Sequence, residues 1–133
     1  MERDVMEYDV LVVGAGPAGL SAAIKFAQLN KKNNTNHSIC VIEKGSEVGA
    51  HILSGNVFEP TALNELIPDW KDKEAPLETP VKKDVVKYLI NKNISIPIPF
   101  PGTFMPNFNN HGNYIMSLAN FCRWLAKEAE SLG

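Results

Sequence analysis

The stretch from Tyr8 to Glu43 constrains the fold of this chain more than any other part of it. An apolar, β-branched run at 8–13 is followed at once by Gly14-Ala15-Gly16-Pro17-Ala18-Gly19. Leu20, Ala23, Ile24 and Ala27 then recur at helical spacing, and a second apolar run at 38–42 ends on Glu43. This order of strand, glycine turn, helix, strand and acid is typical of a dinucleotide-binding βαβ unit.

Each part of such a unit has a physical task, and this chain has a residue for each task. Gly14 permits the tight turn after the strand, and a side chain at Gly16 would block the approach of a pyrophosphate. A side chain at Gly19 would hold the helix away from the strand. The helix N-terminus offers free N–H groups and a partial positive charge to phosphates. We expect Glu43, at the end of the second strand, to accept from ribose hydroxyls.

Composition and charge exclude several other classes of protein. A formal net charge of −2, with both signs mixed along the chain, argues against a nucleic-acid surface. Cys40 and Cys122 lie far apart without metal-ligand spacing, so we expect two core thiols and no metal site. No apolar run reaches transmembrane length, and the residues 1–4 are too acidic for a targeting peptide.

The residues after Glu43 favour FAD over NAD as the nucleotide. A flavin domain passes its chain back across the cofactor, and small residues let the backbone come close. Residues of this kind are frequent here: Gly45, Gly49, Ala50, Ser54 and Gly55. Two readings of His51 remain open, a hydrogen-bond donor beside the flavin or a loop histidine whose polar atoms the backbone satisfies.

Several motifs along the chain resemble one family, electron transfer flavoprotein–ubiquinone oxidoreductase. The first motif, Gly14 to Ala23, is shared by many flavoproteins, and the later ones are more selective. The motifs are Gly14-Ala-Gly-Pro-Ala-Gly-Leu-Ser-Ala-Ala, Val41-Ile-Glu-Lys, Gly49-Ala-His-Ile-Leu-Ser-Gly, Leu66-Ile-Pro-Asp-Trp-Lys, Ala75-Pro-Leu-Glu-Thr-Pro-Val, Asn110-His-Gly-Asn-Tyr-Ile and Arg123-Trp-Leu. The resemblance therefore covers essentially the whole chain.

The resemblance implies a membrane-associated redox enzyme with FAD, one [4Fe–4S] cluster and a ubiquinone site. Such an enzyme passes electrons from reduced electron transfer flavoprotein to ubiquinone. It is peripheral on the inner membrane, at the matrix face in mitochondria or the cytoplasmic face in a bacterium. Its cluster ligands would lie outside this chain, and no side chain here is assigned a catalytic role. The residues expected to bind the cofactor are Gly14, Gly16, Pro17, Ala18, Gly19, Glu43, Lys44, Gly49, His51, Ser54 and Gly55.

The expected fold is α/β, an FAD-binding Rossmann-like domain of the glutathione-reductase type that is truncated in this chain. Residues 1–75 would hold the βαβ unit and the flavin-contact loop, 76–112 the start of an inserted β-rich region, and 113–133 a returning helix. A short helix is expected with Pro60 at its first position, and Trp70 is expected to be a packing anchor. In the last helix, Ser117 is the expected N-cap and Gly133 the expected stop. The face predicted to be buried carries Leu118, Cys122, Leu125, Ala129 and Leu132.

The region 85–108 predicts a hairpin followed by an unusual apolar segment. Strand-forming residues lie on both sides of Asn91-Lys92-Asn93, which suits a turn. No charged residue occurs from Asn93 to Cys122, and four prolines in 97–106 remove backbone donors. Two readings stay open for 94–108, which includes Phe100 and Phe104. The segment is either a buried connector or a membrane-facing, quinone-admitting loop with Lys87 and Lys92 beside it.

Two further classes of protein remain open alternatives. One is a geranylgeranyl reductase-like FAD enzyme acting on prenyl lipids, and the other is a non-catalytic nucleotide-binding module. Only the favoured family should carry a ferredoxin-like cysteine cluster further along the chain. We expect residues 1–133 alone to be inactive, because the remaining strands of the flavin domain would be missing.

Overall fold

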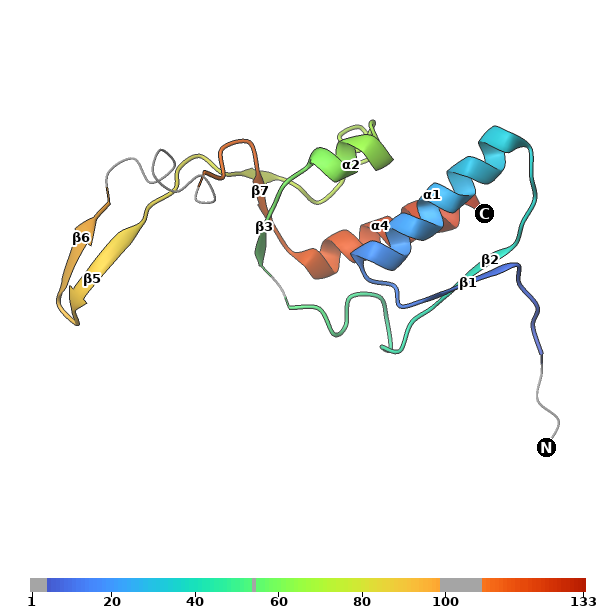
Figure 1. Ribbon diagram of the computed structural model, residues 1–133, viewed down its shortest axis with the longest axis horizontal. Coiled ribbons are helices and arrows are strands. Elements are labelled where there is room, and N and C mark those ends of the chain that lie inside the picture. Colours follow the sequence, from blue (N-terminus) through green and yellow to red (C-terminus); the bar gives the residue numbers. More distant parts are fainter. Residues whose placement is uncertain (1–4, 54, 99–108) are drawn as a thin grey trace.

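The computed structural model describes residues 5–53, 55–98 and 109–133, and Figure 1 shows how their elements are arranged. The first unit has strand β1 (Val10–Val13), helix α1 (Pro17–Asn33) and strand β2 (Ile39–Ile42). β1 and β2 pair in parallel, with Val10 opposite Ile39. Parallel neighbours require a crossover, and α1 supplies it. The predicted strand, turn, helix and strand are therefore confirmed.

The two faces of this small parallel sheet differ in exposure. Alternate residues of β1 point to opposite faces, so Val10 and Val12 share the half-buried one. On the other face, Leu11 and Val13 are 57% and 77% exposed. On α1 the predicted apolar positions are all buried, namely Leu20, Ala23, Ile24 and Ala27. This helix therefore covers one face of the sheet with small and branched side chains.

A second, antiparallel sheet takes its strands from distant parts of the sequence. Its order is β3 (Asn56–Phe58), β7 (Tyr114–Met116) and β4 (Thr79–Pro80). Helix α2 (Thr61–Leu66) follows β3 directly. The expectation that Pro60 is the first helical residue is wrong, because Pro60 is the N-cap, with ψ of 1°, and the helix begins at Thr61. β3, β4 and β7 come one each from the predicted regions 1–75, 76–112 and 113–133. The division of the chain into these regions remains a prediction.

The predicted hairpin is present as β5 (Lys87–Asn91) and β6 (Ile94–Pro97). At its turn, the Asn91 Oδ1 atom accepts from the N–H groups of Asn93 and Ile94, at 2.9 and 3.0 Å. The hairpin lies at one end of the molecule, away from α1 and α4 (Figure 1). The rest of the predicted apolar segment, 99–108, lies outside the described residues, and with it Phe100 and Phe104.

Hydrogen bonds join the two ends of the segment 85–109, which contains this hairpin and is called the excursion below. The bonds between Asp84 and Asn110 are called the clasp. The carboxylate of Asp84 accepts from the backbone N–H and the side-chain amide of Asn110, at 2.9 and 2.8 Å. These hydrogen bonds lower the pKa of Asp84. The N–H of Val81 also donates to the carbonyl of Asn113, at 2.8 Å. The chain therefore leaves and re-enters the second sheet at one place.

The last helix, α4 (Leu118–Leu132), packs beside α1 (Figure 1). The predicted N-cap is confirmed, since the Ser117 hydroxyl accepts from the N–H of Asn120 at 3.4 Å, and Gly133 is the C-cap. Cys122 and Leu125 are buried as expected. The predicted face omitted Phe121, which is also buried and packs on the ring of Phe58, with centroids 4.9 Å apart.

Trp70 is a packing anchor, as predicted. It is buried among the core residues of α2 and α4, and its ring meets Tyr114 edge-on, with centroids 5.7 Å apart. The indole N–H donates to the Asn64 side chain at 2.7 Å, so the buried ring leaves no unpaired donor. No helix in the described part of the chain has the length and apolarity needed to cross a membrane.

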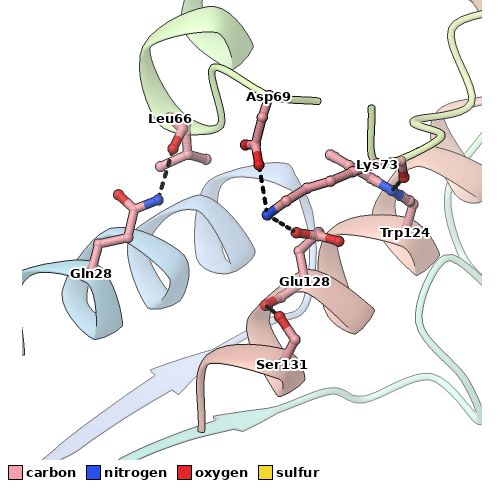
Figure 2. A network of polar contacts seen from close by, with 7 residues as sticks. All are labelled: Gln28, Leu66, Asp69, Lys73, Trp124, Glu128 and Ser131. Atoms are coloured by element: carbon pink, nitrogen blue, oxygen red, sulfur yellow. Dashed lines mark hydrogen bonds and ion pairs between the residues drawn. The ribbon is translucent and has the colours of Figure 1, made fainter. Parts of the chain in front are cut away.

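Polar contacts tie the segment after α2 to both long helices (Figure 2). The Gln28 side chain of α1 donates to the carbonyl of Leu66 at 2.8 Å. Lys73 Nζ lies 2.8 Å from the Glu128 carboxylate of α4 and 3.5 Å from that of Asp69. The Trp124 indole donates to the carbonyl of Lys73 at 2.9 Å. These contacts hold α2 and the turn that follows it against α1 and α4.

Leu125→Ala should strongly destabilise the protein, because Leu125 is only 1% exposed and lies at the centre of this core. We expect the free energy of unfolding to fall by about 2–5 kcal/mol, from lost burial and the cavity left behind. Denaturant unfolding measures this, with exposed Lys127→Ala as the control on the same helix. A loss no larger than the control's, about 0.5 kcal/mol, would contradict the packing described.

Candidate functional site

The candidate site begins at the turn between β1 and α1. The N–H of Gly14 donates to the carbonyl of Ile42 at 2.7 Å, which ties the turn to the end of β2. Gly14 has φ of +103°, in the left-handed region that side-chain-bearing residues rarely adopt. The sequence prediction that this residue must be glycine for the turn is thus supported by its backbone geometry.

The start of α1 is open and uncapped. Gly16 is the N-cap, no side chain bonds to the helix N-terminus, and a Cβ built at Gly16 would meet no atom within 4 Å. Pro17 is the first helical residue and has no N–H, so Ala18 and Gly19 offer the next backbone donors. No acidic side chain lies in the first turn to neutralise the helix dipole. This open end can accept an anionic group such as a phosphate.

Gly19 has a different role from the first two glycines. A Cβ at this position would overlap the carbonyl oxygen of Gly14, and it would lie 3.2 Å from Val12 Cγ1. Any side chain there would therefore push α1 away from β1. This is the close helix–strand approach that the glycine spacing predicts.

Glu43 joins the end of β2 to the glycine turn. Its two carboxylate oxygens accept from different backbone donors, the N–H of Ala15 and the N–H of Gly45, each at 2.8 Å. These two bonds, that from Gly45 first, lower the pKa of Glu43. Each oxygen retains further lone-pair capacity, so the carboxylate can still accept from hydroxyls of a bound ribose. The sequence placed Glu43 near the turn, but nothing in it indicated the bond to Ala15.

The residues after Glu43 that are expected to contact the cofactor differ in their exposure and surroundings. Lys44 and His51 are exposed, and Gly55 has φ of +87° with open space where a side chain would begin. Ser54 lies outside the described residues. Gly49 is buried, and a Cβ there would lie 2.8 Å from the carbonyl oxygen of Ala119. Helix α4 alone therefore explains the need for glycine at 49, so small size there is not in itself a sign of a cofactor.

A cavity of about 310 Å³ runs along β2 between α1 and α4. It reaches from Glu43 at the carboxyl end of β2 to Ile39 at the other end, beside Ala126 and Ala129 of α4. Its lining is mostly apolar, and Glu43 is the polar group nearest the glycine turn. Only the Glu43 end of this cavity has the chemistry of a nucleotide site.

Within the described ranges, no three His, Cys, Asp or Glu side chains lie together in a way that could hold a metal ion. Cys122 is a fully buried free thiol, whose burial raises its pKa, and Cys40 is a partly buried free thiol. The open N-terminus of α1 beside Glu43 suits an anionic dinucleotide. The described site contains no paired nucleophile and base.

Comparison with known proteins agrees with this reading of the fold. Residues 12–68 match the family described as NAD(P)-binding Rossmann-like domain. Two solved structures of similar fold are CtdE in complex with FAD and 2-methyl-3-hydroxypyridine-5-carboxylic acid oxygenase. Their identities are 23% and 24% and their TM-scores 0.55 and 0.57, over 96% of this chain and 29% and 30% of theirs. The α/β, Rossmann-like fold predicted from the sequence is confirmed.

Curated relatives match the chain over its whole length. They include electron transfer flavoprotein-ubiquinone oxidoreductases of Pseudomonas aeruginosa, at 58% identity, and of rice, at 53%, the latter named as mitochondrial. The bovine mitochondrial protein of that name is 49% identical. These matches cover 98–100% of this chain but only 21–24% of the relatives. The resemblance in the sequence motifs is therefore confirmed, and the chain spans less than a quarter of these relatives' length.

Glu43→Gln should change how stability depends on pH. Hydrogen bonds lower the pKa of Glu43 below its ordinary 4.5, so its stabilising effect is present above that value and disappears as pH falls through the lowered one. We expect the gap in thermal midpoint between the unaltered protein and the variant to be largest above pH 4.5 and to shrink as pH falls through the lowered pKa of Glu43. Other carboxylates titrate in both proteins and cancel in this difference. A gap that does not change with pH would contradict the bonding described for Glu43.

Proposed function

We propose that the protein is an FAD-dependent oxidoreductase that passes electrons from reduced electron transfer flavoprotein to ubiquinone, and that this chain holds its FAD-binding part. The observation that carries the proposal is the 58% identity to the Pseudomonas aeruginosa enzyme of that name, maintained over the whole chain. That relative's name gives both the electron donor and the acceptor. The open glycine turn and Glu43 supply a site suited to a dinucleotide.

The residues at the turn fit the two ends of an adenosine diphosphate group. The space beside Gly14 and Gly16 would admit a pyrophosphate, which the N–H groups of Ala18 and Gly19 would bind. The remaining lone pairs of Glu43 would accept from the ribose hydroxyls. The isoalloxazine ring of FAD would supply the redox chemistry, and the protein would position it and exclude competing reactions.

The family resemblance also implies a [4Fe–4S] cluster and a ubiquinone site. We propose that the ligands of the cluster belong to a part of the protein outside this chain. Cys40 and Cys122 do not suit that role, because they lie on different elements and have no further cysteine beside them in the sequence. The ubiquinone site would likewise be completed by residues beyond those described.

The β5–β6 hairpin supports peripheral attachment to a membrane. Tyr88 and Leu89 are 66% and 72% exposed, and Ile94 and Ile96 of the paired strand are about half exposed. An isolated two-stranded hairpin is marginal in water, so such a surface needs a covering partner. Residues 85–98 carry two lysines and no acid, which suits anionic lipid headgroups. We propose that this hairpin meets the membrane that holds the quinone.

Gly16→Val should remove FAD from the protein expressed from its complete open reading frame. The added side chain would occupy the space in which we place the pyrophosphate. We expect the variant to purify with little flavin and, in consequence, not to reduce ubiquinone with electrons from reduced electron transfer flavoprotein. Visible absorbance and a quinone-reduction assay measure the two losses. Ala22→Val, on the exposed side of α1, is the control and should keep both properties.

Full flavin occupancy in Gly16→Val would show that the dinucleotide site lies elsewhere. An unaltered protein with FAD but no quinone reduction would favour the alternative of an enzyme acting on prenyl lipids. A protein without any flavin would leave the alternative of a non-catalytic nucleotide-binding module.

Replacing Ile94 and Ile96, which lie on one face of β6, together by Ser should weaken membrane binding without loss of flavin. Burial of each side chain in the acyl boundary could contribute about 1.5–3 kcal/mol, so we expect liposome affinity to fall at least tenfold. Co-sedimentation with liposomes containing anionic lipid measures this in the complete protein. Val57→Ser, a similarly exposed strand residue away from the hairpin, is the control. Equal binding by all three proteins would assign the hairpin to a contact within the protein instead.

A further inference from the structure

The loop that follows Glu43 is attached to helix α4 at two points. Arg123 Nη2 lies 2.8 Å from the Glu47 carboxylate, and the same guanidinium donates to Asn120 Oδ1 at 3.1 Å. Two residues beyond Glu47, the backbone of Gly49 lies directly against Ala119. Ala119 and Arg123 are one helical turn apart, so they lie on one side of α4. The loop therefore rests along a single side of this helix.

The same loop is bonded at its other end to the nucleotide turn. The N–H of Gly45 donates to one oxygen of Glu43, and the other oxygen accepts from the N–H of Ala15. Between these ends, the N–H groups of Ala50 and Ile52 donate to the carbonyls of Glu47 and Gly49, each at 3.2 Å. The segment 43–52 therefore connects α4 to the glycine turn, and hydrogen bonds within it hold its backbone in place.

We infer that Arg123 is a positioning residue for the bound dinucleotide, acting through Glu47 on the loop that holds Glu43. The inference rests on the proposed FAD site, and it gives Gly49 the related task of letting the loop approach α4. Neither residue needs to touch the cofactor. If the loop moved away from α4, the N–H of Gly45 would move with it, and Glu43 would lose one of the bonds that fix its carboxylate.

An exposed ion pair often contributes little, and the side chains of Arg123 and Glu47 are 41% and 64% exposed. Two features of this pair reduce the entropy lost in forming it. The bond to Asn120 already orients the guanidinium, and the close Gly49–Ala119 contact already restricts the loop. A second ion pair on α4, between Lys73 and Glu128, has the same 2.8 Å separation but holds the segment after α2 instead. It offers a matched control.

The test compares Arg123→Ala with Lys73→Ala in the complete FAD-loaded protein, by FAD dissociation constant, visible circular dichroism of the flavin and thermal midpoint. Arg123→Ala should weaken FAD binding by about two- to fivefold, the range open to an exposed pair, and change the flavin spectrum. Lys73→Ala should lower only the thermal midpoint. The charge-reversed double variant Glu47→Arg with Arg123→Glu should restore FAD affinity.

Gly49→Ala gives an independent arm, because it strains a residue at φ of +87° and places a methyl group against the Ala119 carbonyl. We expect it to weaken FAD binding more than Arg123→Ala does. Unchanged FAD affinity and spectrum in Arg123→Ala, or equal flavin effects in Arg123→Ala and Lys73→Ala, would overturn the inference while leaving the FAD site in place. Absence of FAD from the unaltered protein would instead overturn the proposed function, and this inference with it.

Discussion

The contact between Gly19 and the carbonyl of Gly14 is the constraint on which the rest of the structure depends. It lets α1 begin directly above the end of β1, with its N-terminus uncapped and open. α1 then covers one face of the parallel pair and gives α4 a surface to pack on. Because β2 ends beside the same turn, Glu43 reaches the backbone of Ala15. One missing side chain thus sets the positions of the sheet, both long helices and the nucleotide site.

Much of this arrangement could be predicted from the sequence, because it follows from short-range chemistry. Strand, turn, helix and strand succeed one another within 8–43, and the periodicity of α1 identifies all four of its buried residues. Ser117 and Gly133 mark the ends of α4 by ordinary capping rules. The Asn91-Lys92-Asn93 turn joins the two arms of the hairpin. In each case the residues that carry the signal are neighbours in the chain.

The parts that could not be predicted depend on contacts between distant residues. Phe121 is buried because Phe58, on another element, packs against it, and helical periodicity does not report that partner. Nothing in the sequence shows that the backbone of Gly49 lies against Ala119 of α4. The bond from Ala15 to Glu43 spans 28 residues of sequence. Sequence motifs predicted that the glycine turn and Glu43 lie together, and tertiary packing determines how these residues are held.

The clasp between Asp84 and Asn110 has a consequence for how such a protein can change over evolutionary time. The two residues bring the ends of the 85–109 excursion together, and the neighbouring Val81–Asn113 bond joins them to the second sheet. The length and the side chains of the segment 85–109 can therefore vary without moving β4 or β7, since longer surface loops cost little additional closure entropy. The length of this segment can likewise differ while β1, α1 and β2 keep their arrangement.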